Sequence, residues 1–307
     1  MFLSIVIPVY CSEKIICEVY KKLIQSLSSN NFKYEIIFVD DCSLDDSWNI
    51  IKKLCKNDIR LKAISLNKNY GQHNAIFCGI KNSVGDLIVT MDDDLQHPPE
   101  EINKLINEII KGYDVVYGIS KKLNHSIIRN FFSNFIKNVI RIFMGFDQAQ
   151  NINSFRVFKR NLLDDFVNIR NSKINIDVLL SWSTKNFSSI YVRHNKREKG
   201  SSGYTFGKLF NHSITMITNF SNVPLKIASY LGFIFSIFGL LVLMYVIITF
   251  LFFSYPVKGF PFLASIISIF SGVQLLTLGI FGEYLSNIHS KSISKPMYVI
   301  KEIIKNK

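Results

Sequence analysis

The stretch Leu87-Ile88-Val89-Thr90-Met91-Asp92-Asp93-Asp94 decides the fold, because an almost unbroken apolar run ends in three carboxylates. Such a run is typical of a parallel strand that is buried on both faces. We expect this strand over residues 86–91 and similar strands over residues 3–9, 34–39, 61–66 and 114–118. Helical patterns separate them, over residues 13–28, 45–56, 72–82 and 99–111. The alternation predicts an open, Rossmann-like α/β sheet that binds its ligands at the carboxyl ends of the strands.

The segment that follows this sheet is mixed and basic. Its patterns predict a helix over residues 127–144, a strand over 154–158, a helix over 174–184 and a strand over 189–193. We expect residues 1–205 to form one cytosolic catalytic domain. Residues 206–225 follow, and their apolar side chains from Phe206 to Phe220 share one helical face. This pattern favours an interfacial helix, although an ordinary core-packing helix would show the same spacing.

Two apolar segments near the C-terminus predict a membrane hairpin. Residues 227–257 and 259–282 carry no charge, and each segment exceeds the ~20 residues that cross a bilayer. We therefore expect two transmembrane helices within residues 226–285 and a basic cytosolic tail over 286–307. Only Lys258 lies in the connecting turn, whereas lysines flank both outer ends, which places both ends in the cytosol. These flanking lysines are Lys226, Lys291, Lys295, Lys301, Lys305 and Lys307.

The composition limits the classes of protein that fit. The chain has 307 residues, 48% of them apolar, and a formal net charge of +13. A basic balance fits nucleic acid, anionic lipid or phosphate-bearing substrates, and also a merely solvated basic surface. The hairpin argues against a nucleic-acid binder.

The five cysteines are an odd number without a C-x-x-C pair, so we expect reduced thiols. Met1 leads directly into a strand, and we expect no signal peptide.

Acidic clusters follow two of the predicted strands. Asp92, Asp93 and Asp94 repel one another and need a cation or strong donors nearby. Mg²⁺ or Mn²⁺ would answer that need, since these ions take one or two carboxylates and leave positions for substrate phosphates. Asp40 and Asp41 end the second strand and could accept from a nucleobase or a ribose. The alternative for both clusters is the capping of the helix that follows.

Four motifs together carry a resemblance. They are I-V-I-P-V-Y (residues 5–10), V-D-D-x-S-x-D (39–45), N-Y-G-Q-H-N-A-I (69–76) and M-D-D-D-L-Q-H-P-P-E (91–100). The chain resembles the family 2 glycosyltransferases, and within them the polyprenyl-phosphate group. That group includes dolichol-phosphate mannose synthase, the bactoprenol glucosyltransferases of O-antigen modification and undecaprenyl-phosphate aminoarabinose transferase. The resemblance covers nearly the whole chain, including the hairpin.

The resemblance implies a GT-A fold and an inverting transfer from a nucleotide diphosphate sugar to a polyprenyl phosphate, for cell-envelope glycans. The G-Q-H-N-A-I stretch favours a UDP-sugar. Asp92 and Asp94 would bind the metal and the diphosphate, with Gln96 beside them. The nucleotide pocket would be lined by Pro8, Tyr10, Glu13, Asp40 and Asp41. The family also implies a bacterial inner-membrane location and a homo-oligomer, for example a tetramer.

The acceptor phosphate needs basic residues at the membrane surface. Arg129 and Ser133 lie one helical turn apart, so both can face one phosphate. The resemblance adds Arg156 from the F-R pair, and Arg197, Ser202 and Tyr204 from a loop that closes on the diphosphate. A solvated surface charge is the alternative for each basic residue.

Two positions depart from the family pattern. Gly203 replaces the lysine of the loop, and Gln150 stands where an acidic residue is usual.

Two other functions compete with transfer to a polyprenyl phosphate. One is a transferase that acts on a lipid-linked saccharide, although the Q-x-x-R-W stretch of processive synthases is absent. The other is a non-catalytic membrane accessory, which the intact acidic motifs argue against.

Overall fold

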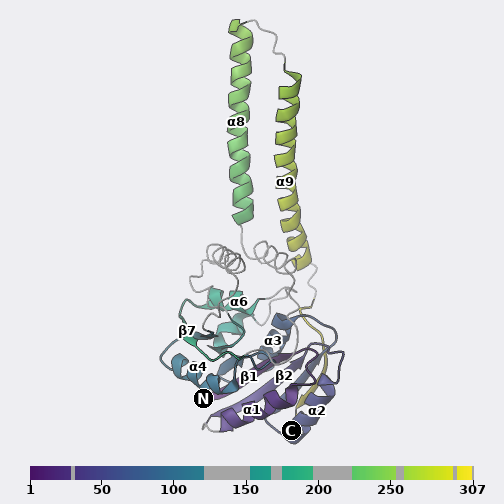
Figure 1. The fold of residues 1–307 in the computed structure, drawn as a ribbon, viewed down its shortest axis with the longest axis vertical. Coiled ribbons are helices and arrows are strands. Elements are labelled where there is room, and N and C mark those ends of the chain that lie inside the picture. The colour runs from purple at the N-terminus through teal and green to yellow at the C-terminus, as the bar shows by residue number, and fades with distance from the viewer. Residues whose placement is uncertain are drawn as a thin grey trace. The chain divides into compact units, whose positions relative to one another are not determined.

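The computed structural model describes residues 1–28, 32–120, 153–166, 175–195, 223–253, 259–292 and 296–305. These residues divide into two compact units, one holding residues up to 195 together with 296–305, the other holding residues 223–292. Figure 1 shows the elements along the chain. They are β1 (Phe2–Val9), α1 (Ile16–Ser28), β2 (Lys33–Asp40), α2 (Ser47–Asn57), β3 (Leu61–Leu66), α3 (Gln72–Lys81), β4 (Leu87–Thr90), η1 (Pro99–Glu101), α4 (Ile102–Ile109), β5 (Val115–Ile119), β6 (Arg156–Lys159), η3 (Arg160–Phe166), α6 (Ile176–Ser183), β7 (Phe187–Tyr191), α8 (Val223–Phe253), α9 (Phe260–Ser292) and β8 (Ile300–Lys305).

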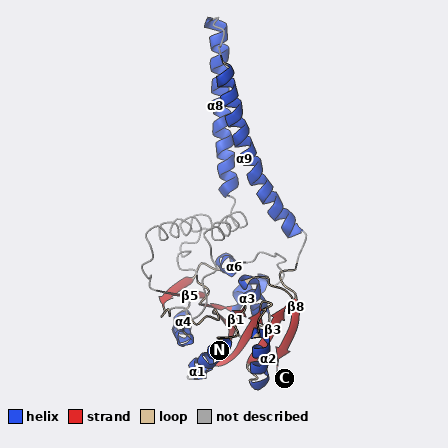
Figure 2. Cartoon of the chain, turned by 45° about the vertical axis from the view of Figure 1, so that its right-hand side comes forward, coloured by secondary structure: helices blue, strands red, loops and turns tan. Residues whose placement is uncertain are grey.

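The described strands of the first unit form one eight-stranded sheet in the order β7-β5-β6-β4-β1-β2-β3-β8. β4, β1, β2 and β3 run parallel to one another, as the apolar runs predict. β6 and β8 run antiparallel to their neighbours, so the sheet is mixed. Figure 2 shows the strands in red with the helices around them. The expected α/β sheet is confirmed.

Helices cover both faces of β1, which explains its unbroken apolar run. Leu3, Ile5 and Ile7 share one core cluster with side chains from α1, α2 and α4. On the other face, α3 packs against β1 and β2. A Cβ atom on Gly79 would lie 2.3 Å from Val6 Cγ1, so this approach of α3 to the sheet requires glycine.

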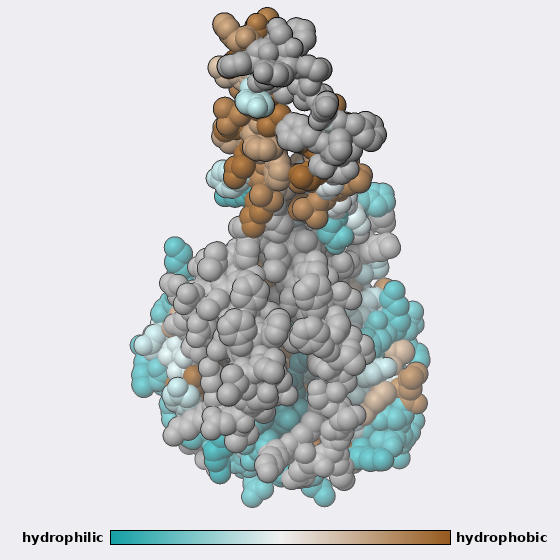
Figure 3. All heavy atoms as spheres, turned by 45° about the horizontal axis from the view of Figure 1, so that its top comes forward, coloured by the Kyte–Doolittle hydropathy of each residue, from teal (hydrophilic) through white to brown (hydrophobic). Residues whose placement is uncertain are grey.

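The second unit consists of the two long helices α8 and α9. Within them, Leu225–Tyr245 and Ile269–Ser286 are long and apolar enough to cross a membrane. The helices contact each other through Phe235 and Phe270, whose ring centroids are 5.8 Å apart. Figure 3 shows hydrophobic side chains gathered on the surface of these helices. Water would disfavour such a surface, so the two helices are candidate membrane spans, as the sequence predicts.

Two predicted helices, over residues 127–144 and 206–220, lie outside the described residues and stay predictions.

The C-terminal segment differs from the expected basic tail. α9 continues to Ser292, and β8 then pairs antiparallel with β3, from Lys62 opposite Lys305 to Leu66 opposite Ile300. The backbone N–H of Asn67 donates to the carbonyl of Val299 at 2.9 Å, next to this ladder. The lysines in β8 are typical of an edge strand. The chain therefore returns to the catalytic sheet after the hairpin.

We expect β8 to stabilise the first unit. Ending the chain at Ser292 would expose the edge of β3 and remove the hydrogen bond from Trp48 Nε1 to Glu302. It should lower the melting temperature by about 5 °C or more, because roughly 2 kcal/mol of edge pairing and apolar burial is lost. Thermal unfolding in detergent measures this. A chain that ends at Lys305 keeps β8 and is the matched control. Equal melting temperatures for the two truncations would contradict the role of β8.

Candidate active site

Three loops with acidic residues begin at one edge of the sheet. β1, β2 and β4 run parallel, and their registers pair Val9 with Asp40 and Val6 with Thr90. Because parallel strands end at the same edge, the loops that follow them start near one another. The sequence predicts ligand binding at this edge.

Asp92 is held by side chains from two other parts of the chain. Gln72 Nε2, at the start of α3, donates to Asp92 Oδ1 at 2.6 Å. Ser154 Oγ donates to Asp92 Oδ2 at 2.6 Å. Hydrogen bonds to an ionised carboxylate are stronger than neutral ones, so these two donors fix the plane of the Asp92 carboxylate.

Asp93 faces the loop that follows β1. Ser12 Oγ donates to Asp93 Oδ2 at 2.5 Å. Burial, together with the smaller effect of the neighbouring Asp92 and Asp94, raises the pKa of Asp93 to about 6, against the effect of the Ser12 hydrogen bond. The middle carboxylate thus shows the mutual repulsion that the sequence predicts.

Asp94 lies in a tight turn. Its Oδ1 accepts the backbone N–H of Gln96 at 3.1 Å, and Leu95 between them has a φ of 56°. No three Asp, Glu, His or Cys side chains among the described residues converge as a set of metal ligands. The carboxylates still fit a hard divalent cation, which takes one or two of them together with phosphate oxygens. Asp92 and Asp94 are the residues that would hold it.

Asp41 organises the loop in front of α3. Its carboxylate is buried and accepts the backbone N–H groups of Tyr70 and Gly71, each at 2.8 Å. Gly71 has a φ of 89°, a conformation that favours glycine. Burial raises the pKa of Asp41. The Asp41 carboxylate therefore positions the segment from which Gln72 reaches Asp92.

Asp40 is also buried, at the end of β2. It accepts from the backbone N–H of Ser43 at 3.3 Å and from Ser65 Oγ at 3.4 Å. Both contacts are long, and burial raises the pKa of Asp40. A base N–H or a ribose hydroxyl would offer this carboxylate a stronger partner.

Hydrogen bonds join the loop after β1 to the loop after β2. Cys11 N donates to Ser43 Oγ at 2.9 Å, and Asp46 N donates to Glu13 Oε2 at 3.1 Å. Tyr10 is 48% exposed at this edge, while Pro8 lies buried within β1. The structure thus places the predicted nucleotide-pocket residues at the ends of β1 and β2 and in the loops that follow these strands.

His97 packs inside the site, where burial favours its neutral form. Its ring stacks on Phe155, with centroids 5.1 Å apart, and meets the ring of His194 edge-on. Burial lowers the pKa of His97 to about 4. The neutral, stacked ring fits the structural role that we expect from the sequence.

Arg156 differs from the predicted phosphate contact. Its side chain is only 1% exposed and forms an ion pair with Asp177, to which the Tyr117 hydroxyl also donates at 2.9 Å. Its Nε donates to Thr90 Oγ1 at 3.1 Å. Every one of these partners lies in the protein interior, so the surroundings of Arg156 favour a structural task over binding a phosphate.

The other predicted acceptor residues lie outside the described part of the chain and stay predictions. These residues are Arg129, Ser133, Arg197, Ser202 and Tyr204.

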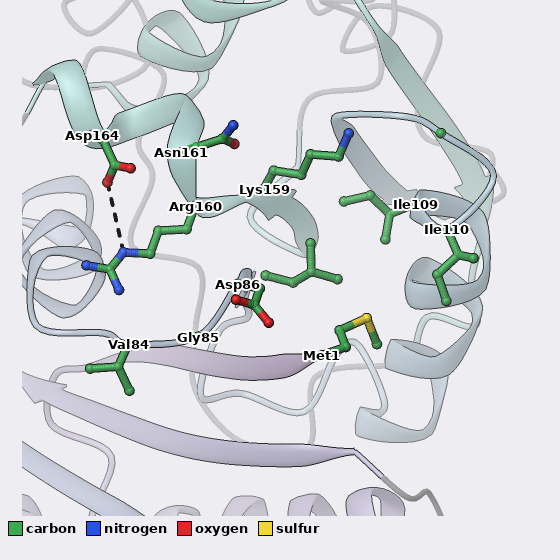
Figure 4. A pocket seen from close by; sticks show the side chains of 12 residues that line it. Met1, Val84, Gly85, Asp86, Ile109, Ile110, Lys159, Arg160, Asn161 and Asp164 are labelled. Carbon is green, nitrogen blue, oxygen red and sulfur yellow. Dashed lines mark ion pairs between the residues drawn. The ribbon is translucent and has the colours of Figure 1, made fainter.

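A cavity of about 750 Å³ lies at the opposite edge of the sheet. Met1 and Asp86 line it at the starts of β1 and β4, and Lys159 lines it at the end of the antiparallel β6. Figure 4 shows the Arg160–Asp164 ion pair on its wall. The cavity contains none of the predicted site residues.

Comparison with known proteins assigns the chain to a family. The profile of glycosyl transferase family 2 matches residues 4–167, and this span contains the acidic clusters described above. The chain belongs to glycosyl transferase family 2. The transferase is therefore an enzyme, as its motifs predict.

Two relatives match this transferase over almost its whole length. The undecaprenyl-phosphate 4-deoxy-4-formamido-L-arabinose transferase of Shewanella sediminis is 33% identical over 99% of this chain and 92% of its own length. The protein of the same name from Proteus mirabilis is 32% identical over 98% of this chain and 93% of its own. These matches fit the polyprenyl-phosphate group that the sequence resembles.

A solved structure supports the fold. Mannosyl-3-phosphoglycerate synthase from Rubrobacter xylanophilus aligns with a TM-score of 0.51 and 14% identity, over 71% of this chain and 72% of that one. The expected GT-A-like fold is thereby confirmed.

Three side chains of the site were not predicted from the sequence. Ser12 donates to Asp93, and both Gln72 and Ser154 donate to Asp92. Gln72 lies within the N-Y-G-Q-H-N-A-I motif and Ser154 directly precedes the F-R pair, but this spacing does not show which carboxylate they contact.

The native cysteines test the predicted nucleotide pocket. At pH 7.5, iodoacetamide should label the exposed Cys11 and Cys17 and spare the buried Cys55 and Cys78. Burial raises the pKa of Cys78 to about 12, and only the thiolate reacts. UDP at ten times its Kd, with Mn²⁺, should slow the labelling of Cys11 about tenfold.

Peptide mass spectrometry follows each cysteine separately, and Cys17 is the internal control. Equal rates for Cys11 with and without UDP would contradict a nucleotide pocket beside the loop after β1.

Proposed function

We propose that this transferase moves a sugar from a nucleoside diphosphate sugar to a polyprenyl phosphate at the cytosolic face of a bacterial inner membrane. The match to the two named relatives carries this proposal, because it spans both the catalytic unit and the two long helices. The cluster of acidic loops at the carboxyl edge of the sheet supports it as well. A polyprenyl acceptor stays in a bilayer, which accounts for the apolar helices α8 and α9.

The acceptor phosphate needs no general base. A phosphate monoester has a second pKa near 6 and is largely dianionic at neutral pH. One phosphate oxygen attacks the anomeric carbon, and the bond from that carbon to the β-phosphate oxygen breaks. The electron pair leaves with the nucleoside diphosphate, and a single displacement inverts the anomeric centre. Positioning of the two reactants and stabilisation of the leaving diphosphate then supply most of the catalysis.

The residues of the site divide this work. Asp40 would accept from the nucleobase or the ribose, and Tyr10 and Glu13 would border the nucleotide. Asp92 and Asp94 would hold Mg²⁺ or Mn²⁺, which neutralises charge on the leaving diphosphate when it is bound. Gln96 lies beside them and takes part in the turn that orients Asp94.

A UDP-linked sugar is the donor that we propose. The G-Q-H-N-A-I stretch supports it. The names of the two relatives point to a 4-formamido pentose as the first sugar to test. The product would be a polyprenyl-phosphate monosaccharide for the assembly or modification of envelope glycans.

The return of β8 supports a two-span arrangement. β3 precedes the hairpin in the chain and β8 follows it, yet the two strands pair in one sheet. A sheet lies on one side of a membrane, so an even number of spans must separate its strands. The lysines at the outer ends of the hairpin favour the cytosol for that side.

We expect the purified transferase to glycosylate undecaprenyl phosphate. Mass spectrometry of the lipid products, with Mg²⁺ or Mn²⁺ and a panel of UDP-sugars, should detect one prenyl-phosphate monosaccharide. Asp94→Asn should lower the rate by about 100-fold or more, since one charged contact to the leaving diphosphate is lost. Asp164→Asn, which changes an exposed acid at the opposite edge of the sheet, is the matched control.

No product from folded protein with any donor would favour a lipid-linked saccharide acceptor or a non-catalytic accessory. Full activity of Asp94→Asn would contradict the metal role of that carboxylate.

Cysteine labelling in intact cells checks the arrangement in the membrane. A membrane-impermeant maleimide should label a cysteine placed at Lys258, which lies between the two helices in the sequence. The native Cys11 and Cys17 are exposed on the catalytic unit and should react only after the inner membrane is opened. Labelling of Cys11 and Cys17 in intact cells would overturn the cytosolic placement.

A further inference from the structure

The antiparallel pairing of β4 with β6 sets four polar residues opposite one another. The register pairs Ile88 with Phe158 and Thr90 with Arg156. Continued by two residues, it brings Asp92 opposite Ser154, and a two-residue step keeps side chains on the same face. Both pairs are in hydrogen-bond contact, at 3.1 Å for Arg156–Thr90 and 2.6 Å for Ser154–Asp92. We call Thr90, Asp92, Ser154 and Arg156 the polar ladder.

The hydrogen bonds of the polar ladder run in one direction. The Nε–H of Arg156 can only donate, so Thr90 Oγ1 accepts from it. The single hydroxyl proton of Thr90 then goes to the carbonyl of Ser154, at 2.6 Å. The hydroxyl of Ser154 in turn donates to Asp92, which is much closer than the alternative acceptor Asn153 Oδ1 at 3.3 Å. Arg156 therefore orients the Thr90 hydroxyl, and Thr90 holds the backbone of Ser154, whose hydroxyl donates to Asp92.

The inner end of the ladder is anchored in the core. Arg156 is almost fully buried and pairs with Asp177 in the first turn of α6. Asn175 caps that turn by accepting the backbone N–H of Asp177 at 2.9 Å. Tyr117 donates to the same Asp177 carboxylate oxygen. Since removal of one partner from a buried ion pair is costly, this anchor holds a single geometry.

We propose that Ser154 and Thr90 are positioning residues for Asp92, and that Arg156 acts through them from the interior and does not bind the acceptor or diphosphate. The inference rests on the proposed function, because it assigns the positioned carboxylate to the cation and the diphosphate. Gln72 holds Asp92 Oδ1 from α3, and the ladder holds Oδ2 from β6. The orientation of Asp92 is thus set before any substrate arrives, which is how a preorganised site lowers a barrier.

The test removes the Ser154 hydroxyl. Ser154→Ala should weaken the binding of Mn²⁺ to the UDP-saturated full-length protein by about 10-fold or more. Electron paramagnetic resonance measures this affinity through the concentration of free Mn²⁺. The same substitution should lower kcat by a similar factor, leave KM for undecaprenyl phosphate within twofold and leave the melting temperature unchanged. Ser154→Thr keeps a hydroxyl and should restore most of the Mn²⁺ affinity.

Ser181→Ala is the matched control. Ser181 Oγ donates to the carbonyl of Val178 within α6, outside the ladder, so this variant should bind Mn²⁺ as the wild type does.

A second variant tests the direction of the ladder without breaking the Arg156–Asp177 pair. Thr90→Val should weaken Mn²⁺ binding in the same direction, and Thr90→Ser should not. The ladder predicts that Thr90 acts on Asp92 through Ser154, so the double variant Ser154→Ala/Thr90→Val should bind Mn²⁺ as Ser154→Ala does. Additive losses would show that Thr90 acts by another route.

Three results would overturn the inference. They are Mn²⁺ affinity and kcat within twofold of wild type for Ser154→Ala, equal losses for Ser154→Ala and Ser181→Ala, and absence of Mn²⁺ binding by the wild type with UDP. A wild type that binds Mn²⁺ and UDP but forms no lipid product would count against the proposed function alone, because the Mn²⁺ titration still tests the ladder.

Discussion

Repulsion between three consecutive carboxylates is the constraint on which this site depends. Asp92, Asp93 and Asp94 follow a buried strand, where the solvent cannot fully screen their charges. The chain meets this constraint by giving each carboxylate its own donors. Asp92 takes them from Gln72 and Ser154, Asp93 from the loop after β1, and Asp94 from its own turn. The acidic cluster thereby ties together the elements that surround it.

The layering of the first unit decides where chemistry can occur. Helices cover both faces of the central parallel strands, and contacts as close as that of Gly79 with Val6 leave no room for a ligand there. The ends of the strands are what this packing leaves accessible. At the carboxyl edge the loops carry acids and backbone donors, so a phosphate-bearing substrate with a cation can be accommodated there. The opposite edge holds a cavity with a different set of charges.

The hairpin and the sheet are joined at two points of the chain. The polypeptide leaves the first unit before α8 and returns to it as β8. The Asn67–Val299 hydrogen bond places the returning segment next to the loop that Asp41 holds.

The sequence by itself determined the features that are written in local patterns. Apolar runs predict the buried parallel strands, the acidic residues that follow them predict the edge where ligands bind, and the two uncharged segments predict the hairpin. Each of these depends on residues that are neighbours in the chain, so no knowledge of the folded partners is needed.

Tertiary structure alone decided the pairings between distant residues. The Ser154–Asp92 contact joins residues 62 positions apart, and the Ser12–Asp93 contact joins residues 81 apart. β8 pairs with β3, although the whole hairpin separates the two strands in the sequence. Arg156 carries a charge that predicts an exposed position, yet strand register directs it into the core, where Asp177 compensates its charge. Register and burial arise from packing of the whole sheet, which is why motif spacing could identify the acids of the site but not the residues that hold them in place.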